Sequence, residues 1–83
     1  MQVTLKLFAS LSSFLPAGAR RNKVDLDVEE GVTILNLLDS HHVPREHCHL
    51  VMLNGVYHPP ETRGEVTMKQ GDVLAVWPPV AGG

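Results

Sequence analysis

The sequence has little cysteine and no long apolar run. Cys48 is the one cysteine among 83 residues, so no internal disulfide can form, and small secreted domains usually need several. No apolar run approaches the roughly 20 residues of a membrane span. The first residues also lack a charged segment followed by an apolar one, as a secretion signal would have. We therefore expect a soluble, cytoplasmic protein that does not enter a membrane.

An excess of positive charge is also missing. Seven Lys and Arg stand against nine Asp and Glu, a net charge of -2, whereas a nucleic-acid-binding domain of this size is normally basic. We therefore expect no nucleic-acid partner. The hydrophobic content of 43% is ordinary for a globular protein, and the length fits one domain.

Periodicity predicts five strands and one main helix. Residues 2–8 and 23–29 alternate between apolar and polar, which is typical of strands with one buried face. Residues 33–42 have helical spacing, with Thr33 as a possible cap. The apolar run 50–53 predicts a strand buried on both faces. Asn54-Gly55 is a strong hairpin turn that leads into Val56-Tyr57, and residues 73–77 form the last strand.

This order of elements predicts an α+β fold. One amphipathic helix must bury its apolar face against a sheet, which gives two layers. If the first and last strands pair in parallel, the sheet is mixed, and the arrangement is the β-grasp of ubiquitin-like proteins. We expect a domain over residues 1–77 and an extended C-terminal tail over residues 78–83, which is flexible at its terminal Gly-Gly.

The tail is the most informative segment. Pro78 has no N–H to give to a sheet, and two successive prolines favour a stiff, extended conformation that preorganises the tail. Gly82 and Gly83 have no β-carbon, so a narrow channel in a partner could admit them. The alternative is that the terminal Gly-Gly is a frayed linker or a cloning scar.

The whole chain resembles the ThiS/MoaD-type sulfur carriers, most of all the small subunit of molybdopterin synthase. The resemblance is carried by the opening strand, by Gly31-Val32-Thr33-Ile34, by Leu53-Asn54-Gly55, by Gly71-Asp72 and above all by Pro78-Pro79-Val80-Ala81-Gly82-Gly83. It implies that an adenylating enzyme of the ubiquitin-activating type uses ATP to join AMP to Gly83. A sulfur donor then converts this acyl-adenylate to a thiocarboxylate.

The resemblance also implies the other partners. Gly83 is then the reacting, sulfur-carrying residue, and Val80, Ala81 and Gly82 enter the channel of the adenylating enzyme or of the large synthase subunit. No bound cofactor is implied, and the chain has no catalytic groups of its own. A carrier for thiamin, cysteine, tRNA thiolation or a tungsten-pterin enzyme, and a ubiquitin-like binding module that is never activated, remain as alternatives.

Three aromatic residues are candidates for a docking patch. Phe8 shares the solvent side of its strand with Lys6, and Trp77 ends the last strand. If those strands are neighbours, Phe8 and Trp77 meet at the root of the tail, and Tyr57 extends the patch. The resemblance implies that all three positions contact the partner enzymes, whereas ordinary core or rim positions are the alternative.

The remaining polar clusters give weaker indications. Five histidines and Cys48 lack the spacing of a zinc site, so we expect no metal. Arg20, Arg21 and Lys23 form the one basic cluster, and a solvated loop is a simpler interpretation than an anion or partner site.

Overall fold

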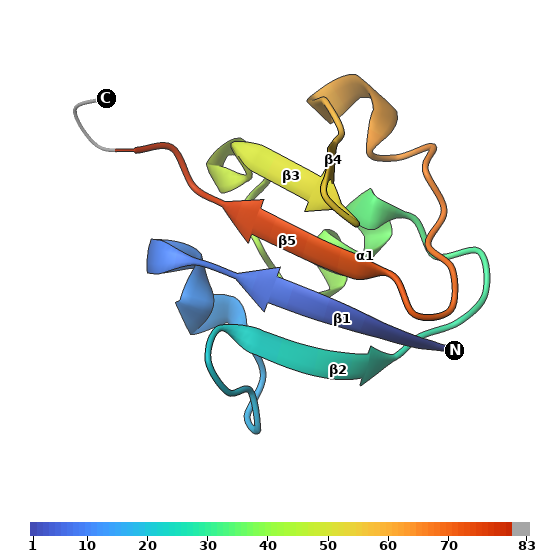
Figure 1. The fold of residues 1–83 in the computed structure, drawn as a ribbon. Helices are drawn as coiled ribbons and strands as arrows, with labels where there is room; N and C mark the ends of the chain where they lie inside the picture. The colour runs from blue at the N-terminus through green and yellow to red at the C-terminus, as the bar shows by residue number, and fades with distance from the viewer. Residues whose placement is uncertain (81–83) are drawn as a thin grey trace.

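The computed structural model describes residues 1–80 and shows one mixed sheet of five strands with its helices packed on one side (Figure 1). The strands are β1 (Gln2–Leu7), β2 (Lys23–Asp27), β3 (Leu50–Leu53), β4 (Val56–Tyr57) and β5 (Val73–Trp77). The main helix is α1 (Ile34–Ser40). Three short 3-10 helices are η1 (Ala9–Phe14), η2 (Arg45–His47) and η3 (Pro60–Thr62).

The strand order is β2-β1-β5-β3-β4. The central pair, β1 and β5, is parallel, and the other neighbouring pairs are antiparallel. This mixed sheet covered by α1 is the ubiquitin-like β-grasp, so the predicted fold class is confirmed. Because β1 and β5 run in the same direction, the end of β1 and the root of the tail lie at the same end of the sheet (Figure 1).

The core lies between the sheet and α1. Leu5, Leu7, Leu74 and Val76 point from the two central strands to this side and are fully buried, as the alternation predicts. Ile34, Leu37 and Leu38 of α1 meet them from the other layer. Fully burying side chains of this size contributes about 1.5–3 kcal/mol each.

Local sequence explains where the elements begin and turn. The Oγ1 of Thr33 accepts a hydrogen bond from the N–H of Asn36 at 3.0 Å, and the Asn36 side chain accepts one from the N–H of Thr33, which makes a capping box. Asn54 and Gly55 both have positive φ angles, 51° and 82°, as a tight hairpin turn between two twisted strands requires.

The prediction that the Leu50–Leu53 strand is buried on both faces is wrong. Val51 is fully buried, but Leu50 is 37% exposed and Met52 is half-buried. Helices cover one side of this sheet only, so the other side of β3 faces solvent although its residues are apolar.

Candidate functional site

The face of the sheet opposite α1 carries an apolar surface that reaches the end of the sheet where the tail begins. Strand register determines which side chains share this face: Trp77 lies opposite Leu50, and Met52 lies opposite both Ala75 and Tyr57. We call the set Phe8, Leu50, Met52, Tyr57 and Trp77 the outer-face patch. Solvated sheet faces usually carry polar residues, so an apolar surface at this position indicates a partner site.

Phe8 and Trp77 form the part of the patch nearest the tail. Their ring centroids are 4.6 Å apart and the ring planes differ by 5°, which is a stacked pair. The N–H of Phe8 donates to the carbonyl of Val76 at 3.1 Å, so the parallel pairing continues one residue past β1. Ala9 then takes a φ of 53°, in the left-handed region, where the chain leaves the strand for η1. The prediction that Phe8 and Trp77 meet at the root of the tail is confirmed.

Tyr57 lies on the edge strand β4, two strands away from Trp77, and is 48% exposed. Met52 and Leu50 of β3 fill the space between these two aromatic residues. The apolar run 50–53 predicts core positions for both, so the sequence pattern does not indicate their place in the patch. The strand order gives them their place, and no local pattern in the sequence distinguishes an exposed apolar face from a buried one.

The tail leaves the sheet directly after the patch. The carbonyl of Trp77 accepts a hydrogen bond from the N–H of His49 at 3.0 Å, and Pro78, which has no N–H, follows at once. Pro78 is half-buried, Pro79 is exposed, and Val80 is 79% exposed. The predicted roles of Ala81, Gly82 and Gly83 fall outside the described residues.

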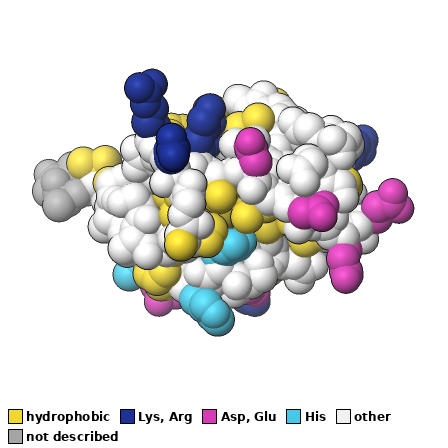
Figure 2. Space-filling view, turned by 90° about the horizontal axis from the view of Figure 1, so that it is seen from below, with side chains coloured by type: hydrophobic (Ala, Val, Ile, Leu, Met, Phe, Trp, Pro, Cys, Tyr) yellow, Lys and Arg dark blue, Asp and Glu magenta, His cyan; other side chains and the backbone are white. Residues whose placement is uncertain are grey.

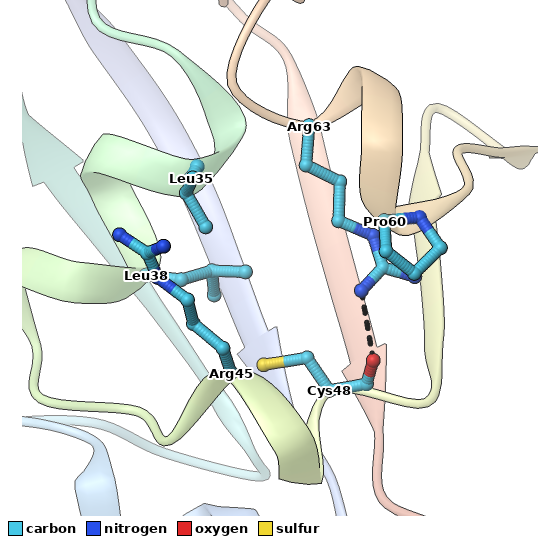
Figure 3. A pocket seen from close by; sticks show the side chains of 6 residues that line it. All are labelled: Leu35, Leu38, Arg45, Cys48, Pro60 and Arg63. Carbon is cyan, nitrogen blue, oxygen red and sulfur yellow. Dashed lines mark hydrogen bonds between the residues drawn. The ribbon is translucent and has the colours of Figure 1, made fainter.

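A pocket of about 240 Å³ lies on the other side of the molecule, beside α1 (Figure 3). Its walls are formed by Leu35, Leu38, Arg45, Cys48, Pro60 and Arg63. Arg45 forms an ion pair with Asp39 at 2.7 Å, and this hydrogen-bonded guanidinium lowers the pKa of the Asp39 carboxyl. Burial raises the pKa of the Cys48 thiol, which makes it a poor nucleophile.

Arg63 is the one buried charged side chain of the described residues, with 4% of its surface exposed. Its guanidinium donates to the carbonyls of Cys48 at 2.8 Å and His58 at 2.9 Å. The first of these bonds is drawn in Figure 3. These bonds tie the loop after β4 to the residues before β3, so the pocket contains a structural clamp, and its thiol is not activated.

Within residues 1–80, no group of three or more His, Cys, Asp or Glu side chains is placed to hold a metal ion. Over the same residues, no helix has the length and apolar character needed to cross a membrane.

Comparison with known proteins places the chain in a family. The family model described as Mut7-C ubiquitin matches residues 1–82. The chain belongs to the Mut7-C ubiquitin family. No curated protein matches it significantly.

Solved structures agree with the assignment to the Mut7-C ubiquitin family. The chain is 27% identical to SAMP1 from Haloferax volcanii, with a TM-score of 0.68 and full coverage of both chains. A second structure of this small archaeal modifier protein gives 26% identity and a TM-score of 0.67, covering 95% of this chain and 98% of the other.

A candidate molybdopterin converting factor subunit 1 from Pyrococcus furiosus shares the fold, at 22% identity and a TM-score of 0.66 over 95% of this chain and 98% of the other. The resemblance to ThiS/MoaD-type proteins is therefore confirmed for the family and the fold. The chain has a ubiquitin-like fold.

Proposed function

We propose that this protein is a sulfur carrier that reacts through the C-terminal carboxylate of Gly83 and supplies sulfur for molybdopterin synthesis as the small subunit of the synthase. One observation carries the proposal: the outer-face patch, of which Leu50 and Tyr57 are exposed and the other members half-buried, ends at the point where the Pro78-Pro79 tail leaves the sheet. A partner that covers the patch therefore also receives the tail.

The chemistry needs activation because an ionised carboxylate is a poor electrophile. A Gly83 oxygen attacks the α-phosphorus of ATP and pyrophosphate leaves, which gives the acyl-adenylate. A sulfide equivalent then attacks the carbonyl carbon and AMP leaves, which gives the thiocarboxylate. In this proposal the partner enzymes supply the acid, base and oxyanion donors for both steps.

The outer-face patch has the role of an anchor for these partners. Phe8, Tyr57 and Trp77 are the aromatic members, and aromatic residues dominate the binding energy of many interfaces. Pro78 and Pro79 fix two backbone angles before binding, which lowers the entropy lost when the tail enters a channel.

The test is incubation of the intact protein with ATP, a sulfide source and the adenylating enzyme of the ubiquitin-activating type from the same organism. Mass spectrometry should find one oxygen replaced by one sulfur, located on Gly83. Deletion of Gly83 should abolish the product while the thermal melt stays unchanged. An intact wild-type protein with a free Gly83 carboxylate that is never adenylated would contradict the proposal and leave a non-activated ubiquitin-like binding module.

A second candidate function is attachment to other proteins, and the likeness to a small archaeal modifier protein favours it. In that case the activated Gly83 carbonyl is attacked by a lysine amine, and an amide bond forms as AMP leaves. Tryptic peptides in which a lysine carries the C-terminal fragment 70–83, which trypsin releases by cutting after Lys69, would favour this function. Transfer of sulfur to a pterin precursor with the large synthase subunit would favour the first.

A further inference from the structure

Positive charge gathers at one corner of the sheet. Four of the seven Lys and Arg residues lie there: Lys6 at the end of β1, Lys23 at the start of β2, and Arg20 and Arg21 in the turn before β2. We call these four residues the basic corner. Figure 2, which views the molecule from below, shows Lys and Arg side chains together at the upper left and most Asp and Glu side chains toward the right.

The register of the sheet makes this corner electrostatically unfavourable for the folded chain alone. Lys6 lies directly opposite Lys23, so the two side chains share the outer face, and like charges directly opposite each other destabilise a sheet. Neither lysine forms an ion pair with another residue between 1 and 80. The next acid along β2, Asp25, accepts a hydrogen bond from the Thr4 hydroxyl at 2.8 Å. Among residues 1–80 neither ammonium group is therefore held in an ion pair, and both are open to a partner.

The corner adjoins the outer-face patch. Lys6 lies beside Ala75 in the parallel register, two residues before Trp77 on β5. The turn of Arg20 and Arg21 lies at the same end of the sheet, because β2 runs antiparallel to β1 (Figure 1). A protein that covers Phe8 and Trp77 and takes up the tail therefore also lies over the corner.

We propose that the basic corner is an electrostatic docking site for an acidic surface on the adenylating enzyme that receives the tail. This inference rests on the proposed function. Charges beside an apolar interface raise the association rate and fix the orientation more than they add to affinity. A nucleic acid fits less well, because Asp25, Asp27, Glu29 and Glu30 continue the same edge and would repel a phosphate backbone.

The test compares two variants with the same change of net charge. Lys23→Glu alters the corner, and Lys69→Glu alters an exposed lysine near the opposite end of the sheet, before β5. Stopped-flow binding to the adenylating enzyme should show an association rate about tenfold lower for Lys23→Glu at low salt. The dissociation rate should hardly change, and the difference from wild type should disappear at high salt. Lys69→Glu should behave nearly as wild type.

The other outcomes overturn the inference in different ways. Equal slowing in both variants would mean that net charge alone acts, and no slowing in either would mean that the corner is a solvated surface. Salt-dependent binding of a single-stranded oligonucleotide that Lys23→Glu abolishes, with enzyme binding unchanged, would assign the corner to nucleic acid. A folded wild-type chain that neither binds the enzyme nor is adenylated would overturn the proposed function and this inference together.

Discussion

Arg63 offers the sharpest test of how the fold is held together. Its guanidinium is almost fully buried and donates through Nε to the carbonyl of His58, and through Nη1 to that of Cys48. A longer contact of 3.4 Å joins Nη2 to the carbonyl of His49. One side chain therefore satisfies backbone acceptors on two segments that lie ten residues apart.

The change Arg63→Met retains most of the apolar stem and removes every donor. It leaves the carbonyls of Cys48 and His58 without their bonds of 2.8 and 2.9 Å. The bond to Cys48 is buried and the bond to His58 is partly buried. An orphaned buried acceptor costs about 1–3 kcal/mol, and removal of a desolvated charge returns part of that loss. We expect the free energy of unfolding to fall by about 2–4 kcal/mol. The whole free energy of unfolding of a chain of 83 residues is about 4–12 kcal/mol, so this loss is a large part of it.

Urea denaturation followed by circular dichroism measures this loss. Arg45→Met is the matched control, because Arg45 lines the same pocket but is exposed and pairs with Asp39 at the surface, so its removal should change little. The loss of unfolding free energy in Arg63→Lys should lie between those of Arg63→Met and Arg45→Met, since one ammonium group cannot reach the same set of carbonyls. A loss below about 1 kcal/mol for Arg63→Met, or an equal loss for Arg45→Met, would refute the clamp.

Three further predictions concern the patch, the tail and the pocket. A double-mutant cycle with alanine at Phe8, at Trp77 and at both should give a coupling energy of about 0.5–1.5 kcal/mol in the free energy of unfolding. If the losses of the two single variants simply add in the double variant, the stacked rings do not stabilise each other. Glycine at both Pro78 and Pro79 should slow sulfur transfer measured by mass spectrometry while Tm stays unchanged, and an unchanged rate would show that the prolines only end the strand. Because burial raises the pKa of Cys48 in the folded chain, iodoacetamide should label it more slowly at pH ~8 than in urea. The same shift means that the contribution of Cys48 to stability is complete below the ordinary thiol pKa of 9.0 and is lost as the pH rises through the raised pKa of the folded chain. The variant Cys48→Ala should lack this loss of stability at high pH.

Most of the fold could be predicted because each element depends on local physics. Alternation in residues 2–8 identifies β1 and its buried side, and Asn54-Gly55 identifies the hairpin, as the positive φ angles confirm. The capping role of Thr33 also follows from local sequence. The parallel pairing of the first and last strands was an assumption from topology, and the structure confirms it.

The features that the sequence did not predict depend on long-range placement. Leu50 and Met52 have the composition of a core strand, and only the position of the helices leaves their side of the sheet open. Arg63 lies just after a short 3-10 helix in a loop, where a charged residue is normally exposed, so no pattern indicates its burial. The clamp depends on the contact between this loop and the residues before β3, which only the folded structure shows.

The two faces of the sheet divide stability from recognition. The side facing α1 holds the fully buried leucines and valines, and the open side holds the outer-face patch together with the Lys6–Lys23 pair. A solvated face selected for stability alone would carry polar residues and opposite charges across the strands. The open side here departs from both expectations at the one end of the sheet where the tail begins. The proposed docking of a partner that covers this end of the sheet and takes up the tail would explain both departures.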